Sequence, residues 1–163
     1  MNKNAIKRFA IEARKKLIAS VSDKAGMLGI TEDDFQKNPI TQGTDFAIYR
    51  TVAGTEITLN RQQCRQRELL VQQLESRGYE AVMEEVAYTW FNRICAIRFM
   101  EVNDYLPTRI RVLSSEKEGK SEPDLVTQAP DVDLDFTDKE REWIIEAKMN
   151  NKLDDLFKML FIK

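Results

Sequence analysis

The chain has 163 residues, of which 42% are hydrophobic and 32% charged, with a net charge of −2. This ordinary globular composition excludes disorder of the whole chain. No apolar run approaches the roughly 18 residues needed to cross a bilayer, and the basic N-terminus lacks the apolar core of a secretory signal. Histidine is absent, which excludes Ser-His-Asp and Cys-His catalysis. Cys64 and Cys95 are the two cysteines, each within a helical pattern, so we expect reduced thiols in a cytoplasmic protein.

Charge is distributed unevenly along the chain. Residues 1–24 carry seven basic side chains against two acidic ones, whereas residues 120–146 carry nine acidic side chains against three basic ones. A small net charge therefore hides a basic N-terminal segment, which is where we look first for contacts with phosphate or with an acidic partner.

The first half of the sequence predicts a helix, a loop and a hairpin. Apolar residues recur at three- and four-residue steps from Lys3 to about Leu28, which predicts an amphipathic helix that ends near two glycines. Residues 30–44 predict a loop. The β-branched segments 46–52 and 55–59 flank Ala-Gly and predict one short β-hairpin.

Two further helices are expected in the middle of the chain. One begins at Asn60, ends at Arg77 before a glycine, and buries Leu70, Val71 and Leu74 while its charged face stays in water. The next, about Tyr79 to Asn103, is the most apolar, with apolar pairs repeating every four residues. Because so wide a stripe implies several neighbours, we expect this helix to be the centre of the core.

The acidic segment 114–135 contains two prolines and predicts an exposed, mobile loop. Thr137 and Glu140 then form a capping-box pattern, and apolar residues continue at helical spacing through Leu160, so the helical segment is expected to run on into a further C-terminal part. We therefore predict a mainly α protein, a bundle of about four to five helices with one short β-hairpin. Its expected organisation is a helical domain over 1–113, a flexible acidic loop over 114–136 and a helical segment over 137–163.

One constellation could hold magnesium. Asp124 followed by Glu146 and Lys148 has the order found in nucleases in which carboxylates bind the metal and a lysine orients the attacking water. However, the capping box predicts a helix here, and on a helix Glu146 and Lys148 lie about 200° apart. A solvated helix face is the favoured interpretation.

A second constellation has the spacing of a calcium loop. Asp131, Asp133 and Asp135 alternate, and Glu142 lies at the twelfth position. Phe136 occupies the sixth position, where the loop needs a glycine, so an acidic linker is favoured and no metal is expected.

Basic side chains on the first two helices are the candidates for binding DNA phosphates or an acidic partner, a contact that is independent of sequence and sensitive to salt. The alternative is that Arg8, Glu12 and Lys16, at i,i+4 steps, pair with one another in water. The candidates are Arg8, Lys15, Lys16, Arg61 and Arg65, with Arg67 beside them.

Four stretches are more specific than their composition. They are MNKNAIKRFAIEAR at 1–14, EEVAYTWFNR at 84–93, RFMEVNDYLP at 98–107 and LFKMLFIK at 156–163. Together they resemble the N-terminal region of the PglX family, the adenine-specific DNA methyltransferases of BREX (bacteriophage exclusion) type 1 phage-defence systems. The segment 87–93 is also similar to segments ahead of the methyltransferase domain in single-chain restriction-modification enzymes.

The resemblance implies a much longer enzyme that transfers a methyl group from S-adenosylmethionine to the N6 amino group of adenine. It also implies double-stranded DNA, other BREX proteins and phage DNA mimics as partners. The family's glycine-containing cofactor loop and its Asn/Asp-Pro-Pro-Tyr/Phe motif, which holds the flipped-out adenine, do not occur in this sequence, where no two prolines are adjacent. We therefore expect no catalytic or cofactor-binding residue in this chain. The expected role is a non-catalytic region that supports assembly and contacts DNA backbone; the alternatives are a docking module for defence partners or DNA mimics, and the magnesium nuclease.

Overall fold

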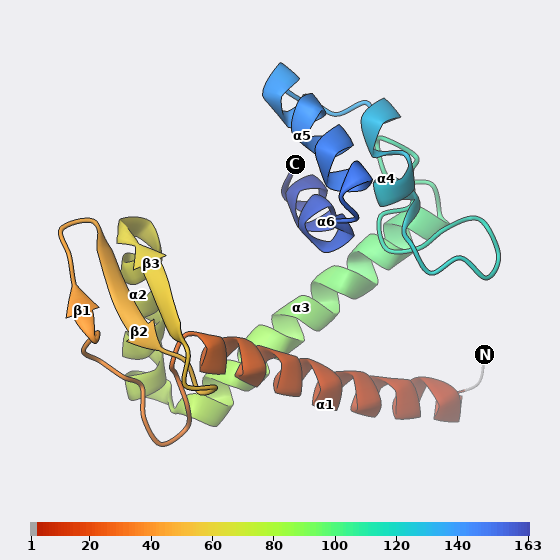
Figure 1. Cartoon of the computed structure of the whole chain (residues 1–163). Coiled ribbons are helices and arrows are strands. Elements are labelled where there is room, and N and C mark those ends of the chain that lie inside the picture. The colour runs from red at the N-terminus through yellow and green to blue at the C-terminus, as the bar shows by residue number, and fades with distance from the viewer. Residues whose placement is uncertain (1–2) are drawn as a thin grey trace. The chain divides into compact units, whose positions relative to one another are not determined.

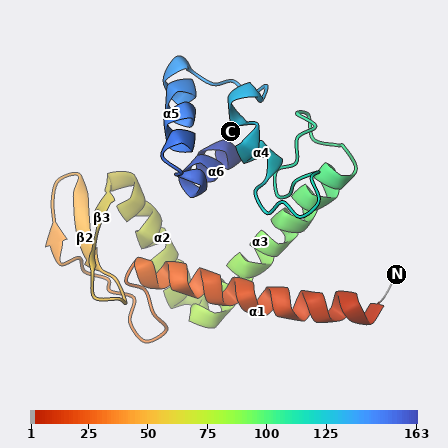
Figure 2. The same cartoon turned by 45° about the vertical axis from the view of Figure 1, so that its right-hand side comes forward.

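The structure is a computed structural model that describes residues 3–163, and its contacts divide the chain into two compact units, Met1–Asn92 and Arg93–Lys163. The described residues form six α-helices, one 3-10 turn and one three-stranded sheet (Figures 1 and 2). The mainly α class with a short hairpin is therefore confirmed. The domain boundaries predicted after residues 113 and 136 stay a prediction.

The helices of the first unit begin and end where the sequence indicates. Helix α1 runs over Lys3–Met27, α2 over Arg61–Arg77, and α3 over Tyr79–Val102. Asn60 caps α2 through a capping box: its Oδ1 accepts from the Gln63 amide at 2.9 Å, and Gln63 Oε1 accepts from the Asn60 amide at 2.9 Å. Gly78 ends α2 in a positive-φ conformation.

The predicted hairpin is present as β2 (Phe46–Arg50) and β3 (Glu56–Asn60), paired antiparallel with Ala47 opposite Leu59. A third strand, β1 (Thr41–Gln42), pairs with β2 and was not predicted because two residues are too short to show a pattern. Ala47, Tyr49 and Leu59 form the buried side of the sheet, as alternation requires.

The core of the first unit lies where three helices meet. Ala25 near the end of α1, Val71 and Leu74 of α2, and Val82 and Met83 of α3 are all buried in one cluster. Each buried large apolar side chain contributes about 1.5–3 kcal/mol, so this cluster holds the C-terminal half of α1 against α2 and the first turns of α3.

The expectation that α3 is the centre of the core is wrong beyond its first turns. Trp90 and Ile94, which belong to the predicted apolar stripe, are each 38% exposed, and the neighbouring Tyr88 and Phe99 are 67% and 59% exposed. After Ala87 the buried residue of this helix is a charged one, Glu101. The width of the apolar stripe therefore does not indicate many neighbours, because part of the stripe lies on faces of α3 that the described residues leave exposed to solvent.

Arg67, predicted to be an exposed basic residue, is buried instead, with 3% of its surface exposed. Its guanidinium donates to the carbonyls of Leu28 at 3.0 Å and Phe35 at 2.8 Å, and it lies 3.8 Å from the centre of the Tyr49 ring. Burial lowers the pKa of Arg67 from its usual value, but an arginine stays protonated in proteins. This one side chain therefore joins α2 to the segment after α1 and to β2.

Gly29 lies where the segment after α1 approaches the end of β2 closely. It has a φ of +70°, and a Cβ built on it would lie 2.3 Å from the Arg50 carbonyl oxygen. No other residue type fits at this position, because both the positive φ and the approach of the backbone require glycine.

The second unit is organised around the segment that follows α3. Helices α4 (Asp124–Thr127), α5 (Asp138–Met149) and α6 (Leu153–Ile162), with a 3-10 turn at Ala129–Asp131, bury a common cluster. The capping box at α5 is confirmed: Thr137 Oγ accepts from the Glu140 amide at 3.3 Å and Glu140 Oε2 accepts from the Thr137 amide at 2.8 Å. The buried members are Leu125, Val126, Ala129, Val132, Phe136, Ile144, Ala147, Leu156 and Leu160.

One expectation for this unit is wrong, and a second gains a break that the sequence did not reveal. The segment expected to be an exposed loop contributes Leu125, Val126 and Val132 to the core, because its few apolar residues are all turned inward. The helical segment expected from Thr137 onward consists of two helices, α5 and α6, because the chain turns at residues 150–152, where Asn151 has a φ of +54°. The apolar spacing continues across this break and so conceals it.

We predict that Arg67→Met lowers the free energy of unfolding by about 2–3 kcal/mol, because it leaves the partly buried carbonyls of Leu28 and Phe35 without this donor. The matched control is Arg65→Met on the exposed face of the same helix, which we expect to change stability by less than about 0.5 kcal/mol. Urea unfolding followed by circular dichroism measures both. Equal midpoints for the two variants would show that Arg67 does not hold the unit together.

Candidate functional site

The basic candidates of α1 are exposed side chains on its N-terminal half. Arg8 and Lys15 are seven residues apart and share one face, and Lys16 lies about 100° further round the helix. The ion pairs of residues 3–163 include neither Arg8–Glu12 nor Glu12–Lys16, so the predicted pairing along the helix is not present there. These positive charges remain available to a ligand.

Arg61 and Arg65 occupy a different place. They lie one turn apart on α2 and line a shallow hollow of about 350 Å³ beside the turn between β1 and β2. Asp45 and Glu68 line the same hollow, so its formal charge is balanced. This pair is a weaker candidate for phosphate than the sequence indicated.

The five candidates do not form one patch. Figures 1 and 2 both show the N-terminal half of α1 running away from α2 and the sheet. Three further basic residues of the first unit are in ion pairs: Arg14 with Glu84, Lys37 with Glu75, and Arg77 with Glu85. The face of α1 that carries Arg8 and Lys15 is therefore the clearest basic surface in the first unit.

The residues of the magnesium constellation do not converge. Asp124 is buried, with 7% of the residue exposed, and its carboxylate accepts from Ser115 Oγ at 2.6 Å and the Glu116 amide at 2.8 Å. Lys148 donates to the Thr127 carbonyl at 2.5 Å, and Glu146 is exposed on the helix α5, where a nuclease would need a strand. All three have structural or solvated positions, so the geometry contradicts the nuclease alternative.

The calcium-loop spacing also does not produce a site. Asp131 ends the 3-10 turn, Phe136 is buried, and α5 begins inside the stretch that a calcium loop would need. Within residues 3–163, no group of three acidic or cysteine side chains is placed to hold a metal ion.

A buried carboxylate that the sequence did not reveal organises the end of α3. Glu101 accepts from the amides of Val112 and Leu113 at 2.8 Å each, and from Ser114 Oγ at 2.9 Å. Arg98 pairs with the same carboxylate. Burial by itself raises the pKa of Glu101, but the hydrogen bonds from Leu113, Arg98 and Ser114 outweigh it and hold the pKa below its usual value. Val112, Leu113 and Ser114 lie 11–13 residues further along the chain, so no local pattern predicts their contact with Glu101.

The fold and the candidate sites together describe the kind of protein region that this chain forms. The described residues form a mainly α region with buried structural charges and an exposed basic face on α1, and they do not assemble the magnesium or calcium constellation that the sequence suggested. No helix within residues 3–163 has the length and apolarity needed to span a membrane.

Comparison with known proteins identifies what this region is similar to. No protein-family model matches the chain. The chain is 40% identical to the adenine-specific methyltransferase PglX of Lacticaseibacillus casei (strain Zhang) over 177 aligned residues, which cover 100% of the chain and 14% of that protein. It is 32% identical to the adenine-specific methyltransferase BrxX of Escherichia coli O9:H4 (strain HS), with 95% of the chain and 13% of that protein covered. The chain thus spans about a seventh of the length of these relatives, and the resemblance to the N-terminal region of PglX is confirmed.

We predict that the second unit becomes less stable in acid. Hydrogen bonds and nearby basic groups hold the pKa values of Glu101 and Asp124 below their usual range even though burial opposes this, and hydrogen bonds from Lys163 and Thr137 lower that of Glu140 to about 2. Because each pKa is lower in the folded state than in the unfolded state, the stabilisation is complete above about pH 5 and disappears as pH falls toward 2.

The measurement is Trp143 fluorescence during urea unfolding between pH 6 and pH 2.5, in a Trp90→Phe background. Glu101→Gln should lower the unfolding midpoint at pH 6 and flatten its pH dependence. An unfolding midpoint that does not change over this pH range in the parent protein would contradict the assignment.

Proposed function

We propose that residues 1–163 form a non-catalytic helical region of an adenine-specific DNA methyltransferase, which supports assembly of the enzyme and contacts DNA backbone through α1. The observation that carries this proposal is the similarity of the whole chain to a small part of PglX and BrxX. The whole chain is similar to part of these methyltransferases but lacks their catalytic motifs. A supporting role is the simplest explanation of these two observations.

The chemistry belongs, in this proposal, to the rest of the polypeptide. S-adenosylmethionine would supply the methyl group for the N6 amino group of a flipped-out adenine. The residues of this chain would neither bind that cofactor nor touch the adenine, because the sequence lacks both the glycine-containing loop and the Pro-Pro motif. Their contribution is to position, not to react.

The DNA contact is proposed for α1 because exposed charges outside ion pairs are free to meet phosphates, whereas charges already in ion pairs are not. Arg8 and Lys15 present such a face, with Lys16 at its edge. Contacts of this kind add affinity and orientation without reading bases. The same face would accept an acidic protein surface that imitates DNA, so phage DNA mimics and other BREX proteins are the alternative partners.

The test is a triple reversal, Arg8→Glu/Lys15→Glu/Lys16→Glu, in the full methyltransferase polypeptide, with duplex binding followed by fluorescence anisotropy at several salt concentrations. We expect weaker binding, and a plot of log affinity against log salt whose slope is shallower by about 0.9 for each phosphate that the variant no longer neutralises. A separate Arg61→Glu/Arg65→Glu variant should have a smaller effect, because Asp45 and Glu68 already balance that hollow.

The matched control reverses three exposed lysines of the second unit, Lys117→Glu/Lys139→Glu/Lys152→Glu, and so changes net charge equally. Binding by the α1 variant that equals wild type, or a control whose affinity falls as much, would refute the contact by α1. Weakened binding of other BREX proteins with unchanged DNA affinity would favour the docking alternative.

A further inference from the structure

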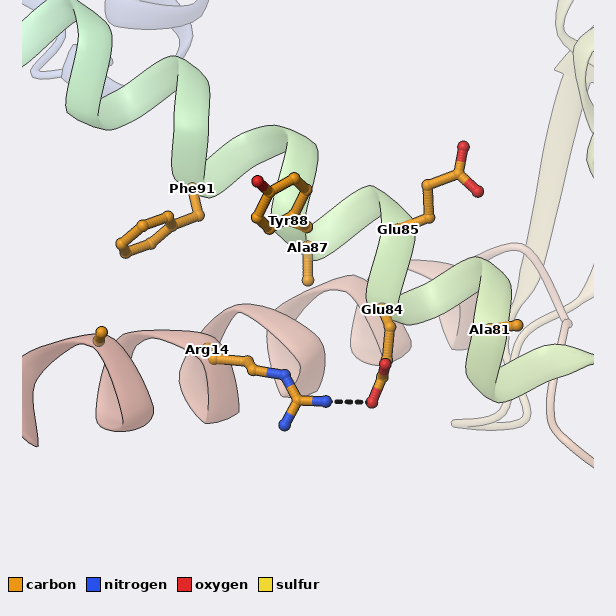
Figure 3. Close-up of a pocket in the computed structure, with 8 residues that line it drawn as sticks. Arg14, Ala81, Glu84, Glu85, Ala87, Tyr88 and Phe91 are labelled. Atoms are coloured by element: carbon orange, nitrogen blue, oxygen red, sulfur yellow. Dashed lines mark hydrogen bonds and ion pairs between the residues drawn. The ribbon is translucent and has the colours of Figure 1, made fainter. Parts of the chain in front are cut away.

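A groove of about 530 Å³ lies between α1 and α3 in the first unit (Figure 3). Ala10 and Arg14 line it from α1, and Ala87, Tyr88 and Phe91 are among the residues that line it from α3. The two helices run antiparallel here, since Phe9 contacts Phe91 while Arg14 pairs with Glu84.

Five of the eight residues that line this groove are alanine or aromatic: Ala10, Ala81, Ala87, Tyr88 and Phe91. In Figure 3, Ala87 and Phe91 point from α3 toward α1. Tyr88 is 67% exposed, and Phe9, whose ring centre is 6.4 Å from that of Phe91, is 60% exposed. The small side chains of Ala10 and Ala87 leave room between these aromatic rings, so bulky apolar side chains of another segment could enter.

The charged residues of the groove are neutralised within the unit. Arg14 pairs with Glu84 across the two helices, and Glu85 pairs with Arg77 (Figure 3 shows the first pair). No unpaired positive charge is therefore available among the lining residues to bind phosphate, in contrast with the Arg8 and Lys15 face. An apolar protein segment suits this surface, whereas nucleic acid does not.

We propose that the groove binds an amphipathic helix from the part of the methyltransferase polypeptide outside residues 1–163, with bulky apolar side chains at i and i+4 seated over Ala10 and Ala87. This inference rests on the proposed function. The chain covers only 14% and 13% of PglX and BrxX, so most of such a polypeptide is available as the occupant. A segment of the same polypeptide also reaches the groove at high effective concentration, which a separate partner does not.

The test replaces Tyr88 with the photoreactive amino acid p-benzoylphenylalanine in the full methyltransferase polypeptide. After irradiation, peptide mass spectrometry should find position 88 joined to a helical peptide from beyond residue 163, with the protein still migrating at the mass of one chain. The control places the same group at Leu69 on α2, which is 54% exposed in the same unit but does not line the groove. A third variant, at Phe9, should reach the same peptide as position 88.

A product of doubled mass would overturn the inference, because a second copy of the chain would then be the occupant. A cross-link to a different protein or to DNA would also overturn it. So would the absence of a cross-link, or equal cross-linking from position 69. DNA methylation by the wild-type polypeptide, which keeps Tyr88, separates this proposal from the proposed function. A cross-link within the chain, found with a wild-type polypeptide that does not methylate adenine, would contradict only the proposed function. Methylation by the wild-type polypeptide without the cross-link would contradict only the occupant of the groove.

Discussion

The fold of the first unit depends on one buried charge. The Arg67 guanidinium binds the carbonyls of Leu28 and Phe35 and lies over the Tyr49 ring, so α2, the segment after α1 and the sheet all meet at one side chain. A planar group with five donors can satisfy two carbonyls and an aromatic face at once, which a lysine cannot. This contact holds the segment that follows α1 beside α2 and the sheet. The basic face lies on the N-terminal half of α1, and the apolar groove is formed between that half and α3.

Local signals in the sequence predicted the elements well. The capping boxes at Asn60 and Thr137, Gly78 and the hairpin were all recognisable because each depends on residues a few positions apart. Contacts between residues far apart in the sequence were not recognisable in this way. Arg67 lies four residues before Val71 on the buried side of α2, a spacing that could have placed it, but its charge argued for solvent. The break at residues 150–152 was concealed because apolar residues recur at helical spacing on both sides of it.

The candidate site was predictable only in part, for the same reason. That Arg8, Lys15 and Lys16 are exposed followed from helical periodicity. That Asp45 and Glu68 balance Arg61 and Arg65 depends on how the sheet packs beside α2, which no local pattern gives. The apolar stripe of α3 predicted a buried helix, but aromatic residues of this helix are exposed. An exposed apolar surface of this kind is suited to binding a partner segment. The basic face and the neutral apolar groove thus indicate two different kinds of ligand on one unit.

The central claim is that this region supports a methyltransferase without taking part in the transfer. Equilibrium dialysis of purified residues 1–163 against labelled S-adenosylmethionine tests it most directly, with the full methyltransferase polypeptide as the positive control. We predict retention of the cofactor by the full polypeptide and none by residues 1–163. Stoichiometric retention by residues 1–163 alone would contradict the claim.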